Sequence, residues 1–121
     1  MKIAVVGSRS FDDPKFMAHI LRHYDITVLI SGGAKGADYY GKLYAFEHQI
    51  LYREYPADWD RFGKTAGFLR NKQIVADCEM VIAFWDKQSR GTKLCIDLAE
   101  ADGKEVHVYW PTIDDLLKQI G

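Results

Sequence analysis

The sequence predicts a doubly wound α/β fold, a five-stranded and mainly parallel sheet with helices on both faces. Short apolar runs rich in β-branched residues alternate with longer helix-like stretches, the pattern of repeated βα units. The runs expected to be strands cover residues 3–6, 27–30, 51–55, 80–85 and 106–110. Several are almost continuously apolar, which is typical of parallel strands covered on both sides. No repeat or linker interrupts the pattern, so residues 1–121 are expected to form one domain.

The composition is that of an ordinary globular domain. Hydrophobic residues make up 48% and charged residues 27% of the chain, which indicates neither disorder nor a fibrous repeat. The formal net charge of −1 provides no general basic field, so nucleic acid is not an expected partner, although a local basic patch is compatible with the sequence. The first apolar run is too short for a signal peptide, and no later run is long enough to cross a bilayer. We therefore expect a cytoplasmic protein without a membrane segment.

Cysteines and histidines give no sign of a metal site. Cys78 and Cys95 lack any Cys-x-x-Cys or Cys/His spacing that would hold zinc, so both are expected to be buried, reduced thiols. The four histidines show no ligand spacing either and receive no catalytic role. We expect no metal and no cofactor.

The first two helices have recognisable starts. Asp13 is expected to cap the first helix, with Pro14 in its first position, and this helix is expected to end near Asp25. The second helix follows Gly36, at the end of a glycine-rich turn. Its apolar residues recur at helical spacing, as expected for a helix packed on a sheet.

Three further helices complete the predicted fold. The third covers residues 65–77, and the fourth begins at Thr92 as N-cap and stops at Gly103. Thr112 and Asp115 have the spacing of a capping box, which predicts a short terminal helix. The inner edge of that helix is expected to carry Leu116, Leu117 and Ile120.

Turns after three of the strands carry the strongest functional signal. The carboxyl ends of parallel strands share one edge of a sheet, and helices that start there direct free N–H groups into the same crevice, where phosphates bind readily. The glycines of the second turn allow left-handed dihedrals and a close approach by an anion, although glycines also serve simply to turn a chain. The turn residues predicted to bind a ligand are Gly7, Ser8, Arg9, Ser31, Gly32, Gly33, Lys35, Gly36, Ser89, Gly91 and Thr92.

Neither common nucleotide fingerprint is present in these turns. The second turn lacks both the Gly-x-Gly-x-x-Gly pattern and the Gly-Lys-Ser/Thr ending of a P-loop, which disfavours an ATPase or an ordinary NAD dehydrogenase. If the backbone of Gly33 contacts phosphate, its replacement by valine is predicted to abolish binding with little unfolding.

Polar residues elsewhere in the chain are additional candidates. Arg70 and Arg90 would each place a cation near the crevice, and Asn71 suits a ribose hydroxyl or a base edge but equally caps a loop. Asp38, Asp86 and Asp97 are candidates for binding a ribose hydroxyl or assisting glycosidic-bond cleavage, with Asp38 and Asp97 as the candidate catalytic carboxylates. The alternative is that Asp38 complements a helix dipole and Asp97 is a solvated helical residue.

Aromatic side chains are expected to form a stacking wall beside the crevice. Residues 56–63 have the composition of an irregular loop on the same edge, and they bring Trp59 and Phe62 there after Tyr55. Trp85 is a fourth candidate, for which packing in the core is the stronger explanation. A planar base would stack against such a wall.

The ordered set of these motifs resembles the YspA-like proteins of the SLOG superfamily, which is named after the Smf/DprA and Lonely Guy proteins. The resemblance covers nearly the entire chain and implies a Rossmann-like sheet that binds nucleotides or nucleotide-derived ligands. The motifs that carry it are Gly7-Ser8-Arg9, Ser-Gly-Gly-Ala-Lys-Gly-Ala-Asp at 31–38, Ala57-Asp58-Trp59, Gly-Lys-Thr-Ala-Gly at 63–67, Arg70-Asn71 and Ser-Arg-Gly-Thr at 89–92.

The resemblance to Lonely Guy enzymes is uneven. These enzymes cleave the N-glycosidic bond of nucleoside monophosphates with an arginine and the glutamate of a Pro-Gly-Gly-x-Gly-Thr-x-x-Glu motif. Arg70 matches the arginine, and residues 89–92 keep the Gly-Thr pair. Cys95 stands where the motif has its glutamate, and the Pro-Gly-Gly is missing. A developing oxocarbenium ion would then need Asp97 or Asp38 as its stabiliser.

Three functions follow as hypotheses. The leading one is a module that senses or sequesters a nucleotide-derived small molecule such as ADP-ribose. Its rival is a nucleoside-phosphate N-glycosidase that uses Arg70 with Asp38 or Asp97. A DprA-like single-stranded nucleic-acid binder is the third, against which the mild acidity argues. Related enzymes assemble through helices beside the pocket, so the resemblance also leaves a homodimer open.

Overall fold

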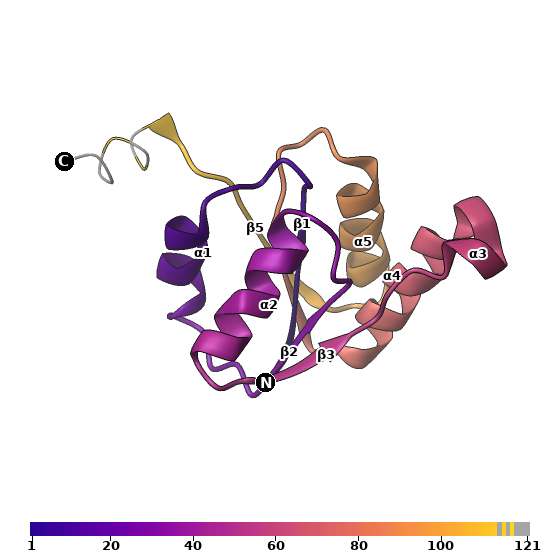
Figure 1. Ribbon diagram of the computed structural model, residues 1–121, viewed down its shortest axis with the longest axis horizontal. Coiled ribbons are helices and arrows are strands. Elements are labelled where there is room, and N and C mark those ends of the chain that lie inside the picture. The colour runs from indigo at the N-terminus through magenta and orange to yellow at the C-terminus, as the bar shows by residue number, and fades with distance from the viewer. Residues whose placement is uncertain (114, 116, 118–121) are drawn as a thin grey trace.

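The computed structural model describes residues 1–113, 115 and 117 and has the predicted α/β architecture (Figure 1). Five strands form one sheet within these residues, in the order β3-β2-β1-β4-β5, and each neighbouring pair is parallel. The strands are β1 (Lys2–Gly7), β2 (Val28–Ser31), β3 (Leu51–Glu54), β4 (Met80–Phe84) and β5 (Glu105–Tyr109). The helices are α1 (Pro14–Leu21), α2 (Ala37–Glu47), α3 (Trp59–Phe62), α4 (Ala66–Asp77) and α5 (Arg90–Ala101), with a 3₁₀ turn over Gly63–Thr65.

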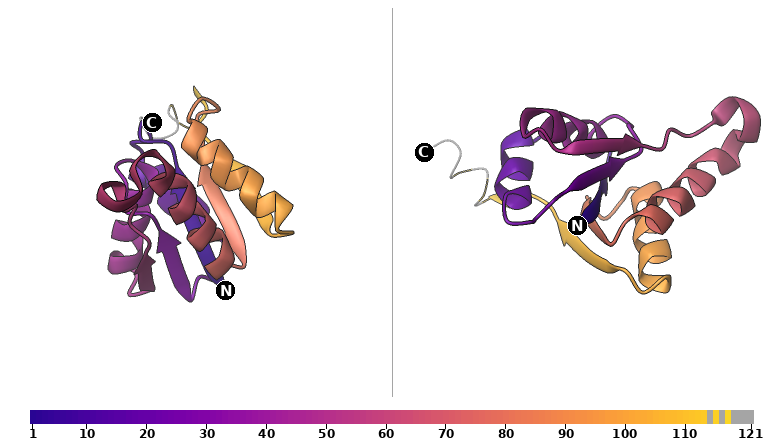
Figure 2. Two further views of the ribbon diagram at one scale, coloured as in Figure 1. Left: turned by 90° about the vertical axis from the view of Figure 1, so that its right-hand side faces the viewer. Right: turned by 90° about the horizontal axis from the view of Figure 1, so that it is seen from below.

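The helices cover the sheet from both sides (Figure 2). Alternate side chains of β1 point to opposite faces. Ile3 and Val5 pack with residues of α1 and α2 in one core cluster. Ala4 and Val6 pack with residues of α4 and α5 in the other. This division explains why the central strands are apolar at nearly every position.

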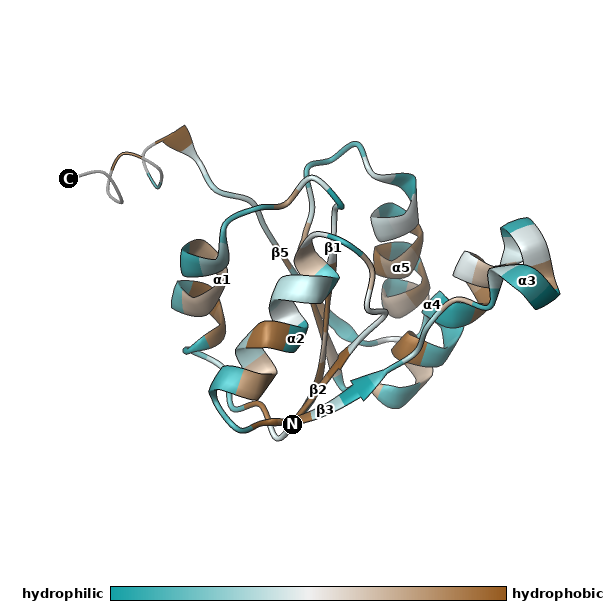
Figure 3. Ribbon diagram, in the orientation of Figure 1, coloured by the Kyte–Doolittle hydropathy of each residue, from teal (hydrophilic) through white to brown (hydrophobic). Residues whose placement is uncertain are grey.

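Hydropathy falls from the centre of the sheet to its edge. Every residue of β4 is buried, whereas β3 at one edge is mostly exposed and carries Arg53 and Glu54. Figure 3 shows brown in β2 and teal in β3, its neighbour at the edge. Charged side chains on an edge strand oppose pairing with other chains.

The start of α1 confirms the predicted cap. The Asp13 carboxylate accepts a hydrogen bond from the backbone N–H of Phe16 at 3.0 Å, and Pro14 takes the first helical position. The predicted end near Asp25 was late, because the α-helical bonding stops at Leu21. The following residues form i→i+3 hydrogen bonds, Tyr24 N–H to Leu21 C=O among them, and turn the chain toward β2.

Other boundaries differ from the prediction for local reasons. Ser89, not Thr92, caps α5: its hydroxyl accepts the Thr92 N–H, and the helix begins at Arg90. The expected loop at 56–63 contains the one-turn α3, because the Asp58 carboxylate accepts the Arg61 N–H at 3.1 Å.

The carboxyl-terminal segment is described in part. Thr112 and Asp115 form the reciprocal hydrogen bonds of a capping box, at 2.8 to 3.1 Å. Leu117, expected on the inner edge of a terminal helix, is 57% exposed. The prediction for Leu116 and Ile120 lies outside the described residues. No helix of the part that the structure describes is long and apolar enough to cross a membrane.

Candidate functional site

The candidate site lies where the loops after β1, β2 and β4 meet, at the carboxyl edge of the sheet. The helix after β1 covers one face and the helix after β4 covers the other, so the crevice between these neighbouring strands is a topological switch point, the usual ligand position in open α/β sheets. Gly36 has φ +90°, and a Cβ there would collide with the Ser8 carbonyl oxygen. Gly36 therefore allows the first two loops to touch.

An ionised carboxylate fixes the loop between β4 and α5. Asp86 accepts hydrogen bonds from the backbone N–H groups of Gln88 at 2.8 Å and Ser89 at 2.9 Å. The bonds from Ser89 and Gln88 lower its pKa to about 2. Its own N–H donates to the Ser8 hydroxyl oxygen at 3.0 Å, and its carboxylate accepts the Ser10 hydroxyl. Sequence reasoning missed this role, although an Asp followed closely by a Ser is typical of such turns.

Asp38 is a buried carboxylate under the second loop. Its Oδ2 accepts the Gly32 N–H at 3.1 Å. Burial raises its pKa to about 6, while the Arg70 charge and backbone hydrogen bonds, that of Gly32 among them, act in the opposite direction. Asp38 thus holds the glycine-rich turn in shape and lies beside a cation.

Arg70 and Asn71 tie α4 to the two loops. The Arg70 Nη1 donates to the Gly32 carbonyl oxygen at 3.3 Å, and its Nε donates to Asn71 Oδ1 at 3.0 Å. The buried Asn71 amide then donates from Nδ2 to the Gly91 carbonyl oxygen at 3.2 Å. Both ends of this amide are therefore engaged within the protein.

These residues surround a small cavity of about 80 Å³. A water molecule occupies about 30 Å³ of liquid, so the space suits a group of the size of one phosphate. Cys95 lines it, and burial raises the pKa of this thiol to about 12, which keeps the thiol neutral near pH 7. The residues that line this cavity, called the central cavity below, are Val6, Gly7, Arg9, Ala34, Asp38, Arg70, Asn71, Ser89, Gly91, Thr92 and Cys95.

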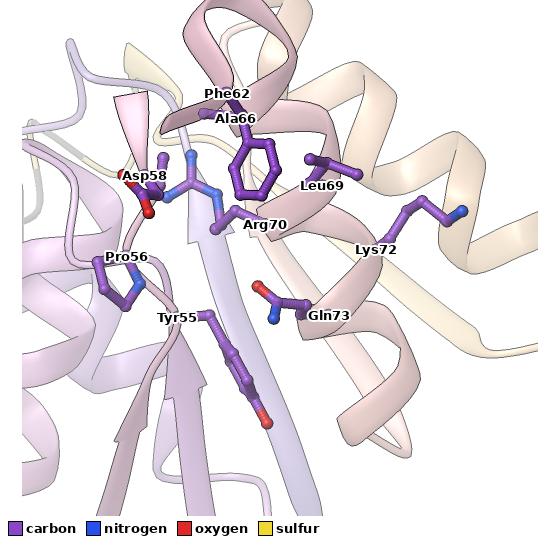
Figure 4. Close-up of a pocket in the computed structure, with 10 residues that line it drawn as sticks. Tyr55, Pro56, Asp58, Phe62, Ala66, Leu69, Arg70, Lys72 and Gln73 are labelled. Atoms are coloured by element: carbon purple, nitrogen blue, oxygen red, sulfur yellow. The ribbon is translucent and has the colours of Figure 1, made fainter. Parts of the chain in front are cut away.

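A wide groove of about 820 Å³ adjoins the central cavity on the side of α4. Figure 4 shows Phe62 directed into this groove, with Arg70 behind it and Tyr55 on the opposite wall. Sequence reasoning foresaw these aromatic residues and the arginine but missed Leu69 and Gln73. The groove, called the aromatic groove below, is lined by Tyr55, Pro56, Ala57, Asp58, Phe62, Ala66, Leu69, Arg70, Lys72 and Gln73.

A hollow of about 430 Å³ adjoins the central cavity on the side of α2. Arg9 lines both spaces, and the exposed Lys35 lies on the hollow. This region, called the cationic hollow below, is formed by Arg9, Ser10, Phe11, Asp12, Lys35, Gly36, Tyr39 and Tyr40.

Several predicted site residues lie elsewhere or have structural roles. Asp97 is on the exposed face of α5, where it pairs with Lys93 at 3.1 Å. The Ser31 hydroxyl is buried and hydrogen-bonded to Tyr52 at 2.8 Å. Trp85 donates from Nε1 to the Ser89 carbonyl oxygen and packs on the core. The residues absent from the linings of the three spaces are Ser8, Ser31, Gly32, Gly33, Trp59, Trp85, Arg90 and Asp97.

No group of three or more His, Cys, Asp or Glu side chains suited to a metal ion occurs among the described residues. The two cysteines are buried and free. The polar groups that line the three spaces are thus cations, hydroxyls, amides and the carboxylates of Asp38, Asp58 and Asp12.

Comparison with known proteins identifies similar chains. The chain is 34% identical over 82 residues to the Gene 61 protein of Mycobacterium phage D29, an alignment that covers 63% of this chain and 66% of the phage protein. DNA processing protein A (DprA) from Streptococcus pneumoniae has a similar structure, with a TM-score of 0.75 and 22% identity over 99% of this chain and 56% of that one. The match thus spans just under two thirds of the phage protein, and this chain spans about half the length of the Streptococcus protein.

A second similar structure is that of DprA from Helicobacter pylori, described as showing a unique single-stranded DNA binding mode. Its TM-score is 0.63 at 20% identity, over 98% of this chain and 72% of that chain. At these identities the likeness establishes a shared fold. A family model, described as "YspA, cpYpsA-related SLOG family", matches residues 1–62.

Proposed function

The chain belongs to the YspA, cpYpsA-related SLOG family, and from that premise we propose that it binds a nucleotide-derived small molecule, such as ADP-ribose, through a phosphate held in the central cavity. The observation that carries the proposal is the position of this cavity. It lies at the switch point of the sheet, where ligands of open α/β folds bind, and it has the size of one phosphate group. Arg70 and Arg9 supply positive charge on its wall.

The start of α5 supports the same proposal. Gly91 lies in the first turn of this helix and lines the central cavity. A Cβ on Gly91 would meet no described atom within 4 Å, so the backbone at this point is open to a ligand. Backbone N–H groups of a first helical turn suit an anion.

Glycosidase activity receives less support from the geometry. Asp97 faces solvent on the far side of α5 from Cys95, and the neutral Cys95 thiol cannot replace a glutamate as a stabiliser of positive charge. Asp38 is left as the candidate carboxylate, and it is already engaged by the Gly32 N–H. Binding without cleavage is therefore the primary proposal.

Single-stranded DNA is the second candidate ligand. The expectation that nucleic acid is not a partner is weakened by the fold shared with a DprA protein whose structure shows single-stranded DNA binding. Arg9, Arg70 and Lys72 line spaces along the carboxyl edge, with Phe62 between the last two in the aromatic groove. Cations and stackable rings are what single strands require.

Thermal unfolding in the presence of a ligand panel tests the proposal. The panel contains cytoplasmic nucleotides, in keeping with the expected location: AMP, ADP, ATP, NAD and ADP-ribose, with oligo(dT) as the nucleic-acid arm. A ligand at a hundredfold excess over its Kd adds about 2.7 kcal/mol to the free energy of unfolding, which raises the unfolding midpoint by several degrees. Recovery of the intact ligand by chromatography identifies a binder, and free base identifies a glycosidase.

The remaining outcomes discriminate among the other possibilities. A shift only with oligo(dT), falling steeply with salt, supports the DNA candidate. No shift with any member of the panel contradicts the nucleotide proposal. Light scattering on the same samples reports whether the chain forms the homodimer that the resemblance left open.

A further inference from the structure

The central cavity has a larger space on either side and shares one lining residue with each of them. Arg9 lines both the central cavity and the cationic hollow, and Arg70 lines both the central cavity and the aromatic groove. The three volumes are about 430, 80 and 820 Å³ in the order hollow, cavity, groove. These three neighbouring spaces along the carboxyl edge of the sheet are together called the track below.

The size of the central cavity limits what it holds. At about 80 Å³ it lies far below the 300 to 1,000 Å³ that encloses a typical small-molecule ligand. A ligand with a phosphate in this cavity must therefore extend into the groove, the hollow or both. The chemistry of these two spaces decides which end of the ligand lies in each.

The aromatic groove suits a planar, weakly polar group. Tyr55 has its ring held in place by a hydrogen bond from its hydroxyl to Asp77 at 2.8 Å. Phe62 and Leu69 line the groove while remaining 41% and 36% exposed, so apolar surface is available for contact. Asp58 and Gln73 add polar groups at its wall (Figure 4). A nucleobase combines an apolar face with polar edges and matches this lining.

The cationic hollow also has aromatic residues, Phe11, Tyr39 and Tyr40, but its cations are less engaged than those of the groove. In the groove, Arg70 is hydrogen-bonded to Gly32 and Asn71, and the Lys72 ammonium lies over the Phe68 ring. Neither Arg9 nor Lys35 forms an ion pair within the described part of the chain. The carboxylate in this hollow, that of Asp12, accepts a hydrogen bond from the Tyr40 hydroxyl. Two cations against one carboxylate leave the hollow with a net positive charge, which suits an anionic group.

We propose that the track binds a nucleoside diphosphate, free or as part of a larger conjugate, in one direction. The base lies in the aromatic groove, the first phosphate lies in the central cavity, and the second phosphate lies between Arg9 and Lys35. This inference rests on the proposed nucleotide binding and adds the direction of the ligand and the need for a second phosphate.

Calorimetric titration of the full chain with AMP, ADP and inorganic pyrophosphate tests the direction. ADP is expected to bind at least about tenfold more tightly than AMP, because one charge-assisted contact contributes about 1.5 to 3 kcal/mol. The Lys35→Ala variant is expected to bring the ratio of ADP to AMP affinity toward one. The Phe62→Ala variant is expected to lower the ratio of ADP to pyrophosphate affinity by about tenfold, since a stacked base loses its ring contact.

Matched variants separate these effects from general damage. Phe68 is also 41% exposed and absent from the groove lining, so Phe68→Ala controls for loss of an exposed ring. Lys15 is exposed on α1, away from the hollow lining, and Lys15→Ala controls for loss of one positive charge. Both controls are expected to keep the wild-type affinity ratios.

The outcomes distinguish this inference from the proposal on which it rests. Equal affinities for AMP and ADP in the wild type, or a ratio that survives Lys35→Ala, overturn the direction while nucleotide binding stands. Affinity that instead grows with the length of oligo(dT) overturns the diphosphate in favour of a nucleic-acid strand. Absence of binding by AMP, ADP and every other nucleotide of the panel contradicts the proposed function itself.

Discussion

At the scale of single residues, two aspartates of the site show how environment sets charge. Asp86 accepts backbone N–H groups near the surface, and these hydrogen bonds lower its pKa to about 2. Asp38 is buried under the glycine-rich turn, and loss of hydration raises its pKa to about 6. The same side chain is therefore a stable anion in one loop and a group poised between its two protonation states in the next.

The raised pKa of Asp38 predicts a pH-dependent cost to stability. Its pKa of about 6 in the folded state exceeds the ordinary value of 3.8 for an aspartate, so the folded state holds this proton more tightly than the unfolded state does. The stability contributed by this proton is present below pH 3.8 and is lost as pH rises through 6. Asp38→Asn is expected to raise the free energy of unfolding at pH 8 by about 1 to 3 kcal/mol relative to wild type and to change it little at pH 4.

Urea unfolding of both proteins at each pH measures this difference. Asp97→Asn is the control, because Asp97 is exposed and paired with Lys93, and a surface substitution of this kind stays within about 0.5 kcal/mol. A difference between Asp38→Asn and wild type that does not grow from pH 4 to pH 8 would contradict the assignment.

At the scale of elements, two glycines near the starts of α2 and α5 differ in their backbone conformation and in the space around them. Gly33 has φ +72°, and a Cβ there would lie 2.5 Å from the Glu54 carboxylate. Gly91 lies inside α5 with open space around it. The structure argues against the expectation of little unfolding for Gly33→Val, because φ +72° is a strained backbone conformation for a β-branched residue and the end of the Glu54 side chain would have to move.

The matched test of backbone contact with a ligand is Gly91→Ala. Alanine is favoured over glycine within a helix by about 0.5 to 1 kcal/mol, so the variant is expected to unfold at an equal or slightly higher temperature. Its methyl group is expected to obstruct the phosphate, so the midpoint shift caused by the best ligand of the panel should disappear. Thermal unfolding with and without that ligand measures both quantities.

Gly33→Val is the comparison for that experiment. It is expected to lower the unfolding midpoint even without ligand, since φ +72° is unfavourable for a β-branched residue. A Gly91→Ala variant that keeps the full ligand shift would show that no phosphate approaches the start of α5.

At the scale of the whole molecule, the strand order places the site over the most deeply buried part of the sheet. The loops of the central cavity leave β1 and β4, whose core residues are almost completely buried. The aromatic groove and the cationic hollow instead lie toward the exposed α3 and the start of α2. A fixed centre with more exposed flanks is the arrangement expected of a site that recognises a phosphate in a defined position.

Two valines on neighbouring strands test this gradient of burial. Val81 of β4 is 0% exposed and Val108 of β5 is 44% exposed. Val81→Ala is expected to lower the free energy of unfolding by about 2 to 3 kcal/mol, because it removes buried methyl groups and leaves a cavity. Val108→Ala is expected to change it by less than about 0.5 kcal/mol. Chemical denaturation of both variants measures the difference, and equal losses would contradict the described edge position of β5.

Part of the candidate site could be predicted from residue types and spacing. The turns around Gly36 and Gly91 were expected at one edge of a parallel sheet with Arg70 of the next helix beside them, and the structure brings these residues there. The exposed position of Asp97 on α5 could also be predicted from the sequence. Residues two apart on a helix point in nearly opposite directions, so Asp97 cannot share the cavity that Cys95 lines.

The sequence by itself determined the five strands, their parallel arrangement and the edge at which the glycine-rich turns meet, because hydrophobic period and capping residues act over a few neighbouring positions. Only the tertiary structure decided which polar groups of these turns face a ligand. Ser31 and Asn71 have the right chemistry for binding, yet their partners come from β3 and from α5, 20 residues or more away in the chain. Hydrogen bonds between distant segments depend on packing that no local pattern encodes, and the same packing shapes the spaces on either side of the central cavity.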